Sequence, residues 1–127
     1  MKKLALWTLP LLVLGTLLLA ACGSGATTKE QSRQTARDYV TGSPTYVFDG
    51  IPETLKLTVE TVLTEDVAYT FTYEFDSRHA GYGDRTGQAL AQVITHHKAV
   101  ITVENGEVTA AVLDGAWDMQ AQTEPVE

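Results

Sequence analysis

The chain has 127 residues, of which 16 are acidic and nine are basic, so its formal net charge at pH 7 is −7. This length suits one small domain. The acidic balance argues against nucleic-acid binding, because an acidic surface repels phosphate backbones. Cys22 is the single cysteine of the sequence, which excludes a disulfide within the chain.

Residues 1–21 have the composition of an export signal. Lys2 and Lys3 form a short positive region, and an uncharged, leucine-rich stretch follows as far as Ala21. A transmembrane helix is the alternative, since about 18 apolar residues lie near the lower limit for spanning a bilayer. Small residues precede Cys22 and no positive cluster follows it, so we predict a signal peptide over residues 1–21.

The end of this stretch, Leu19-Ala20-Ala21-Cys22, resembles the lipobox of bacterial lipoproteins. The resemblance implies cleavage before Cys22 and attachment of lipid, with acyl chains such as palmitate, to this residue; two or more chains give stable anchoring. It implies a membrane as partner and a position on the extracytoplasmic side of the cell membrane, or of an outer membrane where the host has one. We predict a flexible tether over residues 22–29, which are mostly Gly, Ser, Ala and Thr.

We predict one domain over residues 30–119 and a disordered tail over residues 120–127. The domain begins with a helical pattern, and its apolar residues would bury one narrow stripe: Ala36, Tyr39 and Val40. The capping-box spacing that starts a helix occurs twice: in Thr27 with Glu30 and in Thr28 with Gln31. Gly42 stands where a terminating glycine ends a helix, and a proline follows two residues later.

Alternating apolar and polar residues predict strands after the helix. In residues 55–60, the apolar face consists of Leu55, Leu57 and Val59. In the clearest strand, one face would form the main wall of the core: Val67, Tyr69, Phe71, Tyr73 and Phe75. Asn105-Gly106 is a strong signal for a type I′ hairpin turn. Folding back at this turn pairs apolar residues on one face: Val103 with Val108, Ile101 with Ala110, and Ala99 with Val112.

These elements predict an α+β domain in which one N-terminal helix packs on a four-stranded antiparallel meander sheet. Trp117, after the last strand, is predicted to fold back over one end of the core. The element order is similar to that of cystatin-like folds. That resemblance concerns the fold and implies no function.

The segment 76–88, between the second and third predicted strands, is long for a hairpin connection and rich in functional groups. Six of its residues are candidates for a binding site: Asp76, Arg78, His79, Tyr82, Asp84 and Arg85. The two arginines could clamp a carboxylate or phosphate, with an aspartate to orient them. Glycines at positions 81, 83 and 87 would permit tight bends. The alternative is structural, with aspartate–arginine pairs that hold the loop and Tyr82 capping the core.

No pattern in the sequence fixes a reaction. His96 and His97 are neighbours on a predicted strand, so their side chains would point to opposite faces and could not chelate one metal ion together. His79 and His96 could approach across the loop, but no third ligand follows from the spacing. The motifs of serine hydrolases, phosphate-binding loops and zinc sites are missing from the sequence, so we predict no catalytic residue, no cofactor and no metal.

From Tyr46 to Met119, roughly two-thirds of the chain, the sequence resembles a family of small uncharacterised prokaryotic lipoproteins. Five segments carry the resemblance: Tyr46–Gly50, Glu74–Gln88, Gln92–Thr95, Ala99–Gly106 and Trp117–Met119. Many members of that family have a Cys-x-x-Cys-like pair before the aromatic strand, where this chain has Thr64-Glu65-Asp66-Val67-Ala68. The resemblance implies an exported single-domain lipoprotein, without a redox or metal role based on those cysteines.

The leading hypothesis is a lipid-anchored, non-enzymatic binding module that contacts an envelope protein or a small ligand through the 76–88 loop. One alternative is an envelope assembly protein, or an inhibitor-like protein in view of the cystatin-like element order. A second alternative is a metal-dependent hydrolase that uses His79, Asp76 and Asp84. Unpaired donors that converge on a concave surface would favour a binding site, whereas mutual ion pairs would favour the structural alternative.

Overall fold

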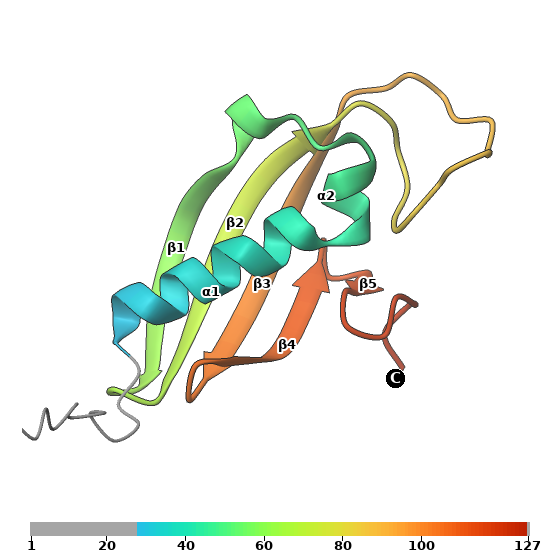
Figure 1. Ribbon diagram of the computed structural model, residues 1–127. Coiled ribbons are helices and arrows are strands. Elements are labelled where there is room, and N and C mark those ends of the chain that lie inside the picture. Colours follow the sequence, from blue (N-terminus) through green and yellow to red (C-terminus); the bar gives the residue numbers. More distant parts are fainter. Residues whose placement is uncertain (1–27, 127) are drawn as a thin grey trace, which may run out of the picture.

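The computed structural model describes residues 28–126, which form two helices on one antiparallel sheet (Figure 1). The helices are α1 (Lys29–Gly42) and α2 (Pro44–Asp49), and a short 3-10 turn, η1 (Pro52–Thr54), leads into the sheet. The strands follow in chain order: β1 (Lys56–Thr64), β2 (Ala68–Ser77), β3 (Thr95–Glu104), β4 (Glu107–Leu113) and β5 (Trp117–Asp118). Each strand pairs with the next. The α+β class is confirmed, but with five strands, because Trp117 also pairs with Leu113.

The helices lie on one face of the sheet and at different ends of it (Figure 1). α1 runs diagonally over β2, β3 and β4, and α2 lies where β2 ends and β3 begins. The β1–β2 and β3–β4 turns are at the opposite end, near the start of α1. Among residues 28–126, no helix is long and apolar enough to cross a membrane. The predicted signal peptide and Cys22 lie outside the described residues.

α1 begins and ends with side-chain caps. Thr28 and Gln31 form the capping box, one of the two predicted alternatives. The helix ends at Gly42, as predicted, but this glycine is its last residue and not a terminating glycine beyond it. Ser43 is the cap and donates through both its N–H and its hydroxyl to a carbonyl of the last turn. Pro44 explains the difference, since it favours an extended conformation at the residue before it and begins α2, a helix that the sequence pattern did not predict.

The core lies between α1 and the sheet. Four of the five residues predicted for its main wall are buried on β2: Tyr69, Phe71, Tyr73 and Phe75. The fifth, Val67, is 37% exposed because it lies in the turn before the strand. α1 meets the wall with small or β-branched residues: Ser32, Ala36 and Val40. Each fully buried large side chain stabilises the fold by about 1.5–3 kcal/mol relative to exposure.

The β3–β4 hairpin confirms the Asn105-Gly106 turn and corrects the register beyond it. Both turn residues have positive φ, 49° and 80°, as a type I′ turn requires. Val103 pairs with Val108 as predicted, but a bulge next to this pair shifts the following ones by one residue: Ile101 pairs with Ala111 and Ala99 with Leu113. A bulge sets two residues opposite one, and simple alternation cannot locate it.

β1 is an edge strand, and a register shift within it displaces the predicted apolar face. Leu57 is half-buried, but Val59 is 51% exposed, so the prediction that it faces the core is wrong. The shift between these residues turns Glu60 toward α1, where its carboxylate pairs with Arg33 and Lys29. The hydrogen bond from Arg33 is the main cause that lowers the pKa of Glu60.

The segment after β5 is more ordered than the predicted tail. Asp118 and Thr123 form an isolated antiparallel bridge. The carboxylate of Asp118 also accepts hydrogen bonds from the backbone N–H groups of Gln120 and Ala121. Bonded structure therefore continues beyond the predicted domain end at Met119. Short-range turn bonds hold this segment, and apolar periodicity does not reveal them.

Candidate functional site

The loop between β2 and β3 spans residues 78–94, so it begins and ends later than predicted. Asp76 belongs to β2. Three glycines have the positive φ angles expected of them: 105° at Gly81, 73° at Gly83 and 79° at Gly87. A Cβ added at Gly81 would lie 3.0 Å from Cδ of Arg85. This glycine therefore makes room for the side chain that organises the loop.

Arg85 lies beneath the loop and is 2% exposed. Its guanidinium donates to five carbonyl oxygens and one carboxylate: Nε to Gly83 (3.2 Å), Nη1 to His79 (3.1 Å), Ala80 (2.9 Å) and Gly81 (3.0 Å), and Nη2 to Thr45 (3.3 Å) and Oδ1 of Asp49 (2.8 Å). Its Cζ lies 4.6 Å from the centre of the Phe48 ring, within cation–π range. Every N–H of the guanidinium is engaged. The predicted two-arginine clamp is therefore not available to a ligand.

Asp49, at the end of α2, supplies the anion for Arg85. It is 9% exposed, and its Oδ2 accepts from the backbone N–H of His79 at 2.8 Å and from Nδ1 at 2.9 Å. A buried guanidinium needs a buried carboxylate, since an unpaired buried charge is costly. Sequence reasoning missed Asp49. It lies in Tyr46–Gly50, one of the segments of the family resemblance, but no spacing connects it to a residue 36 positions later.

Ser77, His97 and Asp114 form a second network, with the atom order of a catalytic triad. Oγ of Ser77 lies 3.1 Å from Nε2 of His97, and Nδ1 of His97 lies 2.7 Å from Oδ2 of Asp114. Asp114 adopts φ of 56°, and its other carboxylate oxygen accepts from the backbone N–H of Lys98 at 2.6 Å. The three residues come from β2, β3 and the turn after β4, so their proximity follows from the sheet and not from sequence spacing.

Burial and hydrogen-bond geometry argue against catalysis by this network. The Ser77 hydroxyl lies closer to the His79 carbonyl, at 2.7 Å, than to Nε2 of His97, whereas in a catalytic triad the histidine accepts the serine proton. Ser77 is 0% exposed and His97 is 1% exposed, which leaves a substrate no access to Oγ. The network holds the start of the loop against β3 and the β4–β5 turn.

The other predicted residues face different surroundings. Arg78 is exposed, and its backbone N–H donates to the Asp49 carbonyl. Tyr82 packs on the core and stacks on Trp117, with ring centres 5.5 Å apart, in the manner of the predicted cap. The hydroxyl of Tyr82 donates to Asp114 at 3.2 Å.

The three residues of the hydrolase alternative have separate side-chain partners: His79 contacts Asp49, Asp76 contacts His96, and Asp84 contacts Thr86. The structure does not bring them together. Within residues 28–126, no group of three or more histidine, cysteine and acidic side chains is arranged to hold a metal ion. No geometry in this part of the chain favours the hydrolase.

His96 and His97 point to opposite faces of the sheet, as predicted, and the side chain of His96 is 55% exposed. Its Nε2 lies 2.9 Å from Glu74 and its Nδ1 lies 2.7 Å from Asp76, and both nitrogens donate to these carboxylates when the ring is protonated. The hydrogen bond to Glu74 and then that to Asp76 raise the pKa of His96. The same bond from His96 is the main cause that lowers the pKa of Glu74.

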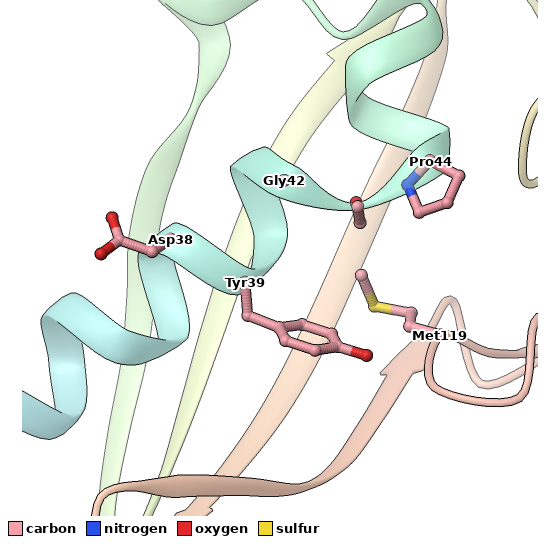
Figure 2. A pocket seen from close by; sticks show the side chains of 6 residues that line it. Asp38, Tyr39, Gly42, Pro44 and Met119 are labelled. Atoms are coloured by element: carbon pink, nitrogen blue, oxygen red, sulfur yellow. The ribbon is translucent and has the colours of Figure 1, made fainter.

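Three hollows share Pro44 in their lining, two of them beside the loop, and we call them together the Pro44 groove. The first, of about 280 Å³, lies between the end of α1 and Met119. Figure 2 shows Tyr39 directed toward Met119 and the carboxylate of Asp38 directed away. The second, of about 640 Å³, is lined by α2 and the loop: Gly42, Pro44, Val47, Phe48, Asp84 and Thr86. The third, of about 490 Å³, lies between the loop and the C-terminal segment: Pro44, Tyr82, Gly83, Asp84, Gln88, Trp117 and Gln122.

A fourth hollow, of about 360 Å³, is lined by Arg78, His79, Gln92 and Ile94. It shares no lining residue with the Pro44 groove. The structure thus divides the six predicted candidates among four environments. Tyr82 and Asp84 line the groove, and Arg78 and His79 line the fourth hollow. Arg85 lies beneath the loop, and Asp76 lies on β2, where it pairs with His96.

Comparisons with family models, with curated proteins and with solved structures find no match for this chain. The resemblances to bacterial lipoproteins and to the small uncharacterised family stay predictions.

Proposed function

We propose that this chain is an exported lipoprotein whose domain is a non-enzymatic binding module, with the Pro44 groove as its contact surface. One observation carries the proposal: the groove borders a loop that a fully hydrogen-bonded arginine holds from the inside. Val47, on the outer side, is 68% exposed. A surface that is rigid before binding loses less conformational entropy when a partner docks.

The position of the groove relative to the predicted anchor supports the same function. α1 begins at Lys29, and the loop lies at the opposite end of the domain (Figure 1). Cys22 precedes Thr28 by six residues, and an extended chain of that length reaches about 20 Å. Lipid on Cys22 would hold the start of α1 near the membrane. The groove would then face away from the bilayer, toward an envelope protein or a small ligand.

Site-specific photocrosslinking tests the binding module in cells that make the full-length protein. A photoreactive amino acid replaces Val47 or Thr86 in the groove, and in the matched control it replaces Thr109, an exposed residue of β4. We expect discrete adducts from both groove positions and none from Thr109. Labelling of equal strength at all three positions, or no adduct from the groove, would contradict the proposal.

Cys22→Ser tests the anchor in the same cells. The variant should lose metabolic labelling by a palmitate analogue and should no longer partition with membranes, because the acylated residue is missing. Its groove adducts should also weaken, since the domain is no longer held beside its partner. Undiminished palmitate labelling of the variant would contradict lipidation at this residue.

The assembly and inhibitor-like alternatives would use the same groove with a different partner. The inhibitor-like role depends on the cystatin-like element order, which stays a prediction. No separate observation favours either alternative over a general binding module. Inhibition of envelope proteases by the purified lipoprotein would favour the inhibitor-like role over the other two.

A further inference from the structure

We infer that the Pro44 groove receives an extended peptide segment that carries a basic side chain between apolar ones. This inference rests on the proposed function, because it names the class of partner for the same surface. It follows from the charge at one position in the groove and from the apolar side chains on both sides of that position.

Asp84 is the charged centre of the groove. It lies where the second and third hollows meet, since it lines both of them. Its Oδ1 accepts from the N–H of Thr86 at 3.0 Å and from the hydroxyl at 2.5 Å, and these bonds lower the pKa of the carboxyl group. Its Oδ2 has no hydrogen-bond partner within residues 28–126. Asp84 is therefore an ionised, exposed carboxylate with one oxygen open to a ligand.

The charge of the lining favours a cationic ligand. Asp38 and Asp84 are its charged residues, and no lysine, arginine or histidine lines any of the three hollows. The nearby cation of Arg85 is buried and paired with Asp49, and it is the smallest of the causes that lower the pKa of Asp84. Charge complementarity of this kind selects partners and speeds their encounter.

Apolar surfaces flank Asp84 on both sides. Pro44, Val47 and Phe48 line the second hollow, and the stacked rings of Tyr82 and Trp117 line the third. In an extended chain, alternate side chains point the same way. When a basic residue of the peptide pairs with Asp84, the peptide residues two positions before and after it would therefore point toward these apolar hollows. Aromatic-lined grooves recognise extended, proline-containing peptides in the same manner.

The experiment is a peptide array probed with the purified full-length protein in detergent. Each peptide has a central arginine, lysine, glutamine or glutamate, flanked at two-residue spacing by leucine, proline or phenylalanine. We expect binding only with a basic centre. Fluorescence anisotropy on the best peptide should show at least about tenfold weaker binding when its basic residue becomes glutamate, because the carboxylates repel.

Matched variants tie this binding to the groove. Asp84→Asn keeps an acceptor oxygen for Thr86 and removes the charge, so it should weaken binding about tenfold. Asp66→Asn removes the same charge from the exposed turn between β1 and β2, outside the three hollows, and it should change affinity less than about twofold. Val47→Ser should weaken binding, whereas Val59→Ser on β1 should not.

Each of the following outcomes would overturn the inference. Binding that ignores the central residue, or that Asp84→Asn leaves unchanged, would show that the charge does not select the partner. Binding of an N-acetylglucosamine oligosaccharide in place of every peptide would make the ligand a glycan. If no peptide binds while Val47 and Thr86 still give photocrosslinked adducts, the partner class is wrong and the binding module stands. If the adducts are missing as well, both fail.

Discussion

Residues 78–86 and residues 87–94 belong to one loop, but the domain holds them by different means. In the first half, Arg85 and Asp49 bind backbone groups that the loop would otherwise bury unpaired, and Thr45 accepts from the N–H of Gly83. In the second half the hydrogen bonds are local, such as that from Val93 to Ala91. A single buried ion pair can thus order a segment that lacks the apolar residues to make its own core.

Arg85→Met has the largest expected effect on stability, because it removes the buried ion pair with Asp49 that orders the first half of the loop. Asp49 would stay buried without its cation, and loss of one partner of a buried pair costs about 3–5 kcal/mol. Urea unfolding should show this loss in the free energy of unfolding. Gln88→Ala, in the exposed second half, is the control and should change stability by less than about 0.5 kcal/mol. Equal effects of the two substitutions on stability would contradict the view that the two halves of the loop are held by different means.

Ser77→Ala measures how much the network of Ser77, His97 and Asp114 contributes to stability at the start of the loop. It leaves the His79 carbonyl and Nε2 of His97 without their partner, and an unsatisfied buried polar group costs about 1–3 kcal/mol. Thermal unfolding against Thr109→Ala, an exposed hydroxyl on β4, isolates this cost. A variant as stable as the control would mean that water replaces the serine hydroxyl.

Amide hydrogen exchange compares the two halves directly. Residues 78–86 should exchange more slowly than residues 87–94, because opening the first half exposes the buried pair of Arg85 and Asp49. In Arg85→Met, peptides from both halves should exchange at similar rates. Slow exchange of residues 87–94 in the unaltered protein would show that contacts other than local hydrogen bonds hold them.

The smallest expected effect is at the start of β3, directly after the second half of the loop, where His96 pairs with Glu74 and Asp76. Because these carboxylates raise the pKa of His96 above its ordinary value of about 6.5, the stabilisation is complete below that value. It is lost as the pH rises through the raised pKa of the folded protein. His96→Gln should lower stability at acid pH by less than about 1 kcal/mol, since the pair is exposed. This prediction requires that the unfolding midpoints of the unaltered protein and His96→Gln converge as the pH rises. A difference between the midpoints that grows with pH would contradict it.

Sequence patterns predicted the elements that depend on neighbouring residues. The buried aromatic face of β2, the Asn105-Gly106 turn and the capping box at Thr28 all follow from local periodicity or turn chemistry. The same reasoning failed where the strands contain a register shift: Val59 does not face the core, and the pairs beyond Val103 are displaced by one residue. One extra residue reverses which face a side chain takes, and no local pattern marks it.

The sites required contacts between distant segments. His79 and Arg85 were predicted as candidates, but their common partner Asp49 was not, because it lies on a short helix that sequence periodicity did not indicate. Ser77, His97 and Asp114 come together through strand pairing alone. Asp84 was predicted, yet only its place between two hollows makes it the centre of the proposed surface.

The sequence by itself determined an acidic chain with one cysteine in a lipobox-like pattern, a helix followed by antiparallel strands, and a long loop with two arginines. Only the tertiary structure decided which arginine is structural. Arg78 and Arg85 have similar surroundings in the sequence, but α2 brings Asp49 and Thr45 to Arg85 and leaves Arg78 exposed. A buried guanidinium is stable only where the fold supplies acceptors for its donors, and that supply is a property of the packed domain.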